Sequence, residues 1–331
     1  MIGELFILGF HGKKIPSWLI EFSSRYGLGG VILFDYYCQT KKLDNNIESA
    51  VQVKELCQSI SELPSSPLVF IDQEGGYVQR LKKERGFAGL VSQQQMNNLP
   101  EEERISAIES CYSEMQTLGI NFNFAPVIDV NYNSSNPNIG KIERSYSESL
   151  ASVESNALLL NSIAKKNNIG LCLKHYPGIG GATVDSHTDI MNLSDNIVPE
   201  QEALFFSLAE KMFGNALLVS HAIVDQWDAE NPITISRAAI QRVRTNLPET
   251  LIISDDMQMQ GLQKIVTTKD ATLKALAAGT DMICIGNNLI NEEADMDKIA
   301  QFCLKSIDEG QLNKDAITDS INRVKKRKER N

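Results

Sequence analysis

The chain has 331 residues, of which 42% are hydrophobic and 22% are charged, as in ordinary soluble globular proteins. This length predicts one large domain that buries a sizeable core without disulfides or metals. The net charge of −10 argues against a general affinity for nucleic acid, whose recognition needs a basic surface.

The N-terminus, from Met1 to Phe6, enters an apolar strand pattern at once. A basic region and a small-residue cleavage site are both missing, so we expect no signal peptide. We also expect no membrane partner, because no apolar run reaches the length of a membrane span. The six cysteines are scattered without a CxxC pair, which is typical of small buried side chains in a reducing compartment. The sequence therefore predicts a cytoplasmic protein.

Short apolar runs alternate with longer amphipathic stretches, and this rhythm predicts βα units and a parallel sheet. The runs are rich in Ile, Val, Leu and Phe with little alternation, which is typical of strands buried on both faces. The eight strand candidates are Leu5–Phe10, Gly30–Phe34, Leu68–Asp72, Asn121–Ile128, Gly170–Lys174, Ala216–His221, Leu251–Asp255 and Thr280–Ile285.

Helical patterns lie between the candidate strands. Apolar residues recur at spacings of four, three and four from Val153 to Ala164, and at three, four and four from Met296 to Ile307. Each set forms one apolar stripe, which would pack the helix against the outside of a sheet.

Eight strands in βα alternation fit a (β/α)8 TIM-like barrel, with a doubly wound open sheet as the main alternative. Polar residues favour the barrel, because Asp72, Lys174, His175, His221 and Asp255 all fall at the carboxyl ends of expected strands. A barrel gathers such residues at one mouth, where its active site lies.

No linker rich in Pro, Gly or Ser divides the chain, so we predict that residues 1–331 form a single catalytic barrel domain. A final helix over about residues 314–327 would pack against its side. The basic run from Arg323 to Arg330 is interpreted as solvated side chains that complement the dipole of this helix.

The segment from Lys174 to His187 carries the clearest chemical signal. It begins at an expected strand end and contains a Gly-rich loop, and two of the four histidines of the chain lie in it. A histidine transfers protons near neutral pH, and a nearby carboxylate can orient it. Asp185 and His187 are two residues apart, so a bent loop would bring them together.

An apolar strand candidate ends in the adjacent acids Asp255 and Asp256. A carboxylate at such a position can attack an anomeric carbon or stabilise a cationic transition state. The alternative is an N-cap for the next helix. Both interpretations hold if Asp255 faces the mouth and Asp256 turns outward.

Three further candidates come from neighbouring segments. Asp72 lies at the end of an expected strand and would accept hydrogen bonds from sugar hydroxyls. The side chain of Arg80 would extend into the same pocket. Arg144 follows a loop rich in Asn and Ser and is a candidate donor through its planar guanidinium.

These segments resemble, in their order along the chain, the motifs of glycoside hydrolase family 3. They are Asp-Gln-Glu-Gly-Gly from Asp72, Ala-Pro-Val-Ile-Asp-Val from Ala125, Lys-His-Tyr-Pro-Gly from Lys174, Asp-Ser-His from Asp185 and Ser-Asp-Asp-Met from Ser254. The resemblance runs from about residue 3 to residue 325 and is greatest to the single-domain bacterial β-N-acetylglucosaminidases of peptidoglycan recycling.

The resemblance implies a TIM-like barrel and a retaining, exo-acting enzyme that releases N-acetylglucosamine through a covalent glycosyl-aspartate. Asp255 matches the nucleophile, His187 the acid/base and Asp185 its partner. Asp72, Arg80, Arg144, Lys174 and His175 match positions that bind the sugar. The resemblance implies no metal and no other cofactor, with muropeptide-derived disaccharides as expected substrates, and we expect a monomer.

Three departures from the family pattern bear on the aglycone. Ile179 and Gly181 replace a second His and an Asp of the Gly-rich loop, the loop before Arg144 is two residues longer, and Tyr77 stands where a basic residue is frequent. Because every matched catalytic position is retained, the reaction type is expected to be unaffected.

Other interpretations remain open on the sequence. A β-glucosidase of the same family is one alternative. Phosphorolysis is another, because a neutral imidazole repels phosphate less than a carboxylate does. A metal-dependent hydrolase would need ligands such as His175, His187, His221 and Asp255, but the chain lacks a His-x-His pair. A non-catalytic sugar-binding protein on the same barrel is the third alternative.

Overall fold

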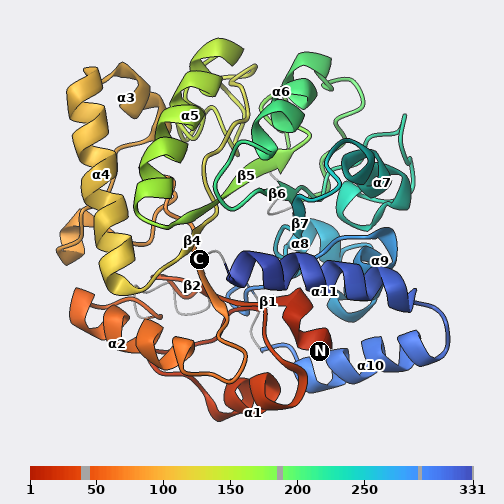
Figure 1. Ribbon diagram of the computed structural model, residues 1–331. Coiled ribbons are helices and arrows are strands. Elements are labelled where there is room, and N and C mark those ends of the chain that lie inside the picture. The colour runs from red at the N-terminus through yellow and green to blue at the C-terminus, as the bar shows by residue number, and fades with distance from the viewer. Residues whose placement is uncertain (39–44, 185–188, 290–292, 330–331) are drawn as a thin grey trace.

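Eight parallel strands form one closed sheet in the computed structural model, which describes residues 1–38, 45–184, 189–289 and 293–329. Neighbouring strands follow the chain order from β1 to β7, and β1 also pairs with β8. A parallel bridge between Ile253 and Met282 joins β7 to the residue before β8, so the sheet closes into a barrel (Figure 1). The strands are β1 (Phe6–Leu8), β2 (Gly30–Leu33), β3 (Leu68–Ile71), β4 (Phe122–Asn123), β5 (Gly170–Tyr176), β6 (Ala216–Val219), β7 (Leu251–Ser254) and β8 (Ile283–Ile285).

Helices surround this barrel on its outside (Figure 1). They are α1 (Ser17–Tyr26), α2 (Ala50–Ser61), α3 (Gln93–Asn98), α4 (Glu101–Leu118), α5 (Leu150–Lys166), α6 (Pro199–Ala209), α7 (Arg237–Asn246), α8 (Gln260–Gln263), α9 (Thr268–Ala278), α10 (Met296–Asp308) and α11 (Lys314–Lys328), with the 3-10 turns η1 (Ile2–Leu5), η2 (Lys83–Arg85) and η3 (Ile233–Ile235). In the part of the chain described, none of the helices is long and apolar enough to cross a membrane.

The barrel interior explains why the strands read as continuous apolar runs. Every residue of the eight strands is buried, because one face of each strand meets the barrel interior and the other meets a helix. The predicted TIM-like barrel is therefore confirmed, and the doubly wound open sheet is excluded by the β1–β8 pairing.

One expected strand is much shorter than the sequence pattern predicted. Asn121–Ile128 was expected to be extended, but regular pairing stops at Asn123 in β4. Pro126 has no N–H to donate to a ladder, and the Asn123 side chain instead exchanges hydrogen bonds with the backbone of Gln73. The chain continues beside β5 through isolated contacts, including a bridge between Val127 and Lys174.

The basic end of the chain is only partly solvated, whereas the sequence interpretation expected solvated side chains throughout: Lys325 and Lys326 are exposed, and others of the run are not. Arg323 donates to the buried carboxylate of Asp281 at 2.8 Å, and Arg327 is only 3% exposed. Lys328 donates to Glu4 and to the carbonyl oxygens of Leu28 and Ser65. Helix α11 therefore fastens the N-terminal segment to the barrel through charge-assisted hydrogen bonds, and Figure 1 shows it beside η1.

Candidate active site

A cavity of about 350 Å³ lies at the carboxyl ends of the strands. Its lining includes Asp72 directly after β3, Lys174 within β5 and Asp255 directly after β7. Arg80, Arg144 and His175 also line it. The structure thus brings together six of the eight residues that the sequence assigned to the site, and its volume suits a small polar ligand.

The end of β7 holds Asp255 at the cavity. Its backbone N–H donates to the carbonyl oxygen of Val219 at 3.2 Å, and its Oδ1 accepts from the N–H of Asp256 at 2.8 Å. Ser254, one residue earlier, is locked to β8 because its Oγ accepts from the N–H of Cys284. The Asp255 carboxylate is therefore a partly exposed group on a rigid strand end.

The opposite part of the cavity is built from a buried ion-pair network. Lys174 donates to Asp72 at 2.8 Å and lies 2.6 Å from Glu74, while Arg80 donates to the second oxygen of Asp72. Burial alone would raise the pKa of Asp72, but Lys174 and Arg80 outweigh it and hold this pKa well below its usual range. Asp72 therefore stays ionised and can accept hydrogen bonds from hydroxyl groups.

Glu74 joins the two deepest cations of the network. It accepts two hydrogen bonds of 2.8 Å from Arg144 and lies against Lys174. Burial would raise the pKa of Glu74, yet Arg144 and Lys174 together lower it to about 2. The bidentate pairing fixes the plane of the Arg144 guanidinium.

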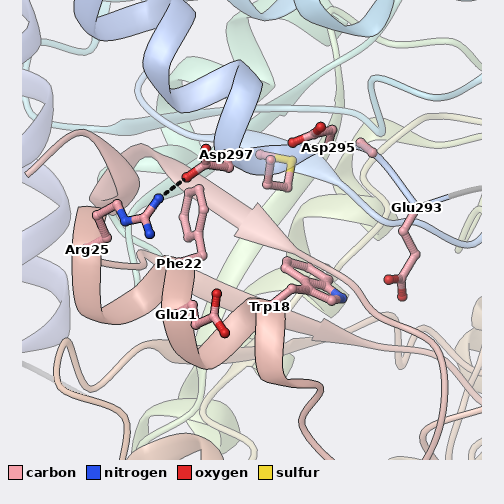
Figure 2. A pocket seen from close by; sticks show the side chains of 9 residues that line it. Trp18, Glu21, Phe22, Arg25, Glu293, Asp295 and Asp297 are labelled. Atoms are coloured by element: carbon pink, nitrogen blue, oxygen red, sulfur yellow. Dashed lines mark hydrogen bonds and ion pairs between the residues drawn. The ribbon is translucent and has the colours of Figure 1, made fainter.

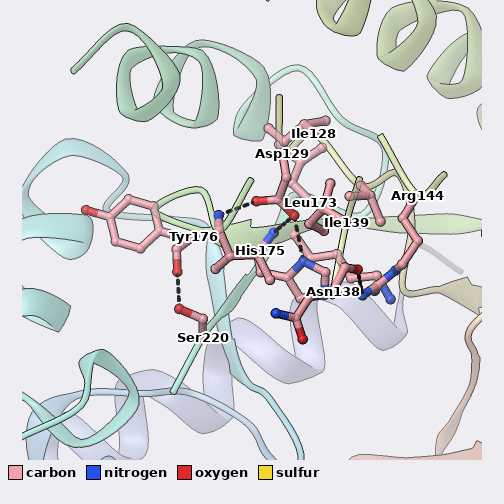
Figure 3. Close-up of polar contacts among 12 residues, drawn as sticks. Ile128, Asp129, Asn138, Ile139, Arg144, Leu173, His175, Tyr176 and Ser220 are labelled. Atoms are coloured by element: carbon pink, nitrogen blue, oxygen red, sulfur yellow. Dashed lines mark hydrogen bonds and ion pairs between the residues drawn. The ribbon is translucent and has the colours of Figure 1, made fainter. Parts of the chain in front are cut away.

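His175 lies between Asp129 and Arg144 (Figure 3). Its Nδ1 is 2.7 Å from Asp129 Oδ2, and its Nε2 is 3.0 Å from Nη2 of Arg144. Both ring nitrogens of His175 therefore have partners within the protein. Those of His221 do as well, since Nδ1 faces Thr234 and Nε2 donates to the carbonyl oxygen of Asp256. Neither imidazole is arranged as a free metal ligand, and the described residues contain no metal-binding group of three or more His, Cys, Asp or Glu.

Asp256 does not turn outward as the sequence interpretation expected. Its side chain lines the cavity, where Oδ1 accepts from the N–H of Gln258 at 2.9 Å and of Gly286 at 3.3 Å. Because the first turn after β7 folds back over the strand end, this side chain links β7 to β8. The next helix, α8, begins only at Gln260 and does not use Asp256 as its N-cap.

Burial raises the pKa of Asp256 to about 7, and the negative charge of Asp255 adds to this effect. The folded chain therefore holds this proton more tightly than the unfolded chain does. The resulting stabilisation is fully present below about pH 4, the ordinary pKa of an aspartate, and is lost progressively as the pH rises from there to 7.

We expect Asp256→Asn to remove this pH dependence. Urea unfolding of both chains at pH 5 and pH 8 should show that the native chain loses about 1–2 kcal/mol relative to the variant on going to the higher pH. This free-energy difference is smaller than the value that the raised pKa of Asp256 would give in full, because water in the cavity screens the side chain. A stability difference between the two chains that is equal at both pH values would contradict the assignment.

The expected acid/base pair, Asp185 and His187, lies outside the described residues. Val184, which precedes them, accepts a hydrogen bond of 2.7 Å from the side chain of Asn138. The backbone carbonyl of Asn138 in turn accepts from Arg144 at 3.0 Å. Val184 is therefore linked by hydrogen bonds, through Asn138, to Arg144 in the cavity lining.

Sequence reasoning missed the roles of Glu74, Asp129 and Asp256 in building the site. Glu74 and Asp129 both lie in motifs that were singled out, but neither was assigned a partner. Their position within family motifs was the available signal. Which cation or imidazole each contacts depends on long-range pairings, such as Glu74 with Arg144, that sequence spacing does not show.

A second hollow of about 470 Å³ lies between α1 and the beginning of α10 (Figure 2). Its charged lining is acidic except for Arg25, which pairs with Asp297 at 2.6 Å. Among the described residues its lining includes no histidine or lysine, and it lies away from the strand-end residues described above. Despite its larger volume, it lacks the groups that sugar chemistry would use.

The chain matches the family model "Glycosyl hydrolase family 3 N terminal domain" over residues 3–326. "Beta-hexosaminidase A" of Pseudoalteromonas piscicida is 29% identical over 95% of this chain and 55% of that relative. "Beta-hexosaminidase" of Pseudomonas aeruginosa is 31% identical over 80% of this chain and 77% of that relative.

Two solved structures share the fold. A fungal multi-domain GH3 β-N-acetylglucosaminidase superposes with a TM-score of 0.86 at 27% identity, covering 99% of this chain and 39% of that one. A GH3 β-N-acetylglucosaminidase from Paenibacillus sp. superposes with a TM-score of 0.85 at 24% identity, covering 99% of this chain and 61% of that one. The chain therefore spans about half the length of the first curated relative and well under half of the fungal chain.

Proposed function

The chain belongs to glycosyl hydrolase family 3, and on that premise we propose that it is a retaining, exo-acting β-N-acetylglucosaminidase. The observation that supports this proposal most directly is the cavity at the barrel mouth. In this cavity the Asp255 carboxylate shares a small space with Asp72 and with the buried cations Lys174 and Arg144. The names of the relatives agree with this substrate class.

The proposed reaction is a double displacement. A carboxylate oxygen of Asp255 attacks the anomeric carbon, and the glycosidic bond breaks as His187 gives its proton to the leaving oxygen. Water then attacks the same carbon, His187 takes the water proton, and Asp255 leaves. N-acetylglucosamine is released with its β configuration retained, and Asp185 would orient His187 and offset its charge.

The binding roles follow from the charges at the cavity. Asp72 and Lys174 are proposed to bind sugar hydroxyls, with Arg80 holding Asp72 from the rim. Arg144 is proposed to bind the sugar through its guanidinium. These groups are held by one another before any ligand arrives, so they need little reorganisation during the reaction.

The proposal is tested by turnover of p-nitrophenyl β-N-acetylglucosaminide beside the β-glucoside. Release from the acetamido sugar alone supports it, and preference for the glucoside assigns the chain to another branch of the family. A requirement for inorganic phosphate would identify a phosphorylase instead. Binding of N-acetylglucosamine without turnover of either glycoside would identify a sugar-binding protein.

We further propose a muropeptide-derived disaccharide as the physiological substrate, with the protein acting as a monomer in the cytoplasm. The resemblance to single-domain enzymes of peptidoglycan recycling supports the substrate. The free cysteines, five of them buried, are consistent with a reducing compartment. Comparing muropeptide-derived and chitin-derived disaccharides as substrates tests the first of these proposals.

Tyr77 is expected to contribute to recognition of the aglycone. Its side chain is 76% exposed yet lines the cavity, so it presents an aromatic face at the rim. Tyr77→Ala should lower kcat/KM for N,N′-diacetylchitobiose about 2- to 12-fold, since aromatic packing contributes about 0.5–1.5 kcal/mol. The methyl β-glycoside, which lacks a second ring, should change less than about twofold on the same argument.

The exposed Tyr132, which is not part of the cavity lining, provides the matched control through Tyr132→Ala. Equal losses on both substrates for the Tyr77 variant would show that this side chain does not contact the aglycone ring.

A further inference from the structure

We propose that Asp129 is a positioning residue that acts through His175 to aim Arg144 at the substrate. The three side chains lie in series (Figure 3), and two of them, His175 and Arg144, line the cavity. Asp129 is fully buried and does not line the cavity, so any effect on a ligand must pass through its neighbours. The inference rests on the proposed function only for the identity of the substrate.

The position of the proton on the His175 ring follows from the contact between this ring and Arg144. The guanidinium of Arg144 has only N–H donors and stays charged in proteins. Its Nη2 lies 3.0 Å from His175 Nε2, so this contact is a hydrogen bond only if Nε2 carries no proton and accepts. The proton of the neutral ring is then on Nδ1, where it donates to Asp129 Oδ2 at 2.7 Å. The charge of Asp129 favours this tautomer.

Asp129 is itself held in place by further hydrogen bonds. Its Oδ2 also accepts from the backbone N–H of His175 at 3.1 Å, and its Oδ1 accepts from the N–H of Ile179 at 2.8 Å. A carboxylate can accept all three hydrogen bonds, because both of its oxygens are acceptors. An asparagine cannot, because its amide group would face an N–H at one of the two oxygen positions.

Most N–H groups of Arg144 already donate to protein acceptors. Two of its N–H groups donate to Glu74, one to the Asn138 carbonyl oxygen and one to His175 Nε2. Within the part of the chain that the structure describes, these bonds account for four of the five N–H groups. The remaining one is on Nη1. With Glu74 and Asn138, His175 therefore decides which N–H of Arg144 is presented to the cavity.

The tautomer is tested first on the native chain, without reference to activity. Labelling histidine with ¹⁵N and assigning His175 by its loss in His175→Gln reports which ring nitrogen carries the proton. We expect a protonated Nδ1 and an unprotonated Nε2. A protonated Nε2 would overturn the proposal, whatever the chain hydrolyses.

The coupling is tested by a double-mutant cycle on an activated aryl β-N-acetylglucosaminide. Asp129→Asn alone should lower kcat/KM about 10- to 100-fold, because it leaves a buried donor unpaired and weakens the hold on the ring. In an Arg144→Lys background, which already lacks the planar donor, the same change should lower kcat/KM less than about threefold. Equal losses in both backgrounds would mean that Asp129 acts only through overall stability.

Asp281→Asn is the matched control, because Asp281 is equally buried but pairs with Arg244 and Arg323 away from the cavity. It should lower the urea midpoint and leave the KM of the native chain unchanged. A native chain that hydrolyses no glycoside would refute the proposed function, whereas an active chain with additive losses would refute only the role of Asp129.

Discussion

Replacing Asp255 with asparagine is expected to lower turnover of a β-N-acetylglucosaminide by about 10³-fold or more, with the fold retained. The amide cannot form the glycosyl ester, so the two-step path is closed. The substitution preserves the side-chain shape, and Oδ1 can still accept from the N–H of Asp256. Initial rates and a urea unfolding curve for the variant measure the two effects separately.

Asp319→Asn controls for the loss of one negative charge, because Asp319 is exposed on α11. This variant should turn over at the native rate. If Asp255→Asn kept more than about a tenth of the native rate, the attacking group would have to be a different one.

Replacing Glu74 with glutamine is expected to have the largest effect on stability, about 3–5 kcal/mol, because it leaves buried cations without their shared carboxylate. Lys174 keeps Asp72 as a partner, whereas Arg144 loses its only carboxylate partner among the described residues. Activity should fall as well, since the guanidinium plane is no longer fixed by a bidentate pair. Urea unfolding and kcat/KM measure the two consequences.

Glu84→Gln is the control for this experiment. Glu84 is exposed, so its neutralisation should change stability by less than about 0.5 kcal/mol. A Glu74→Gln chain as stable as this control would show that the network is not a structural requirement of the barrel.

The barrel could be predicted from the sequence because its strands are buried on both faces. Runs such as Leu251 to Ser254 have no polar residue before the strand end, so the position of the mouth follows directly. Six residues expected there do line one cavity. In a closed barrel of parallel strands, the carboxyl ends of all strands lie at the same end of the barrel.

The contacts within the site could not be predicted in the same way. Glu74 and Asp129 look like ordinary loop acids in the sequence, and only the fold reveals that they contact Arg144 and His175. Asp256 was expected to point outward because adjacent acids commonly divide between a site and a helix cap. The turn after β7 instead folds its side chain towards β8.

The contacts of the C-terminal helix could not be predicted from the sequence either. Clustered lysines and arginines are solvated in most helices, so the sequence favoured that interpretation. The partial burial of Arg323 and Lys328 depends on Asp281 and Glu4, which are distant in the chain and unremarkable in their local sequence.

The central claim is that Asp255 forms a covalent ester with N-acetylglucosamine. Mass spectrometry of proteolytic peptides, after reaction with a fluorinated N-acetylglucosaminide that is attacked quickly and hydrolysed slowly, tests it most directly. The account predicts one added sugar on the peptide that contains Asp255, and none on the Asp255→Asn chain. An active native chain that carries the sugar on another residue, or that carries none and releases the α-anomer first, would contradict it.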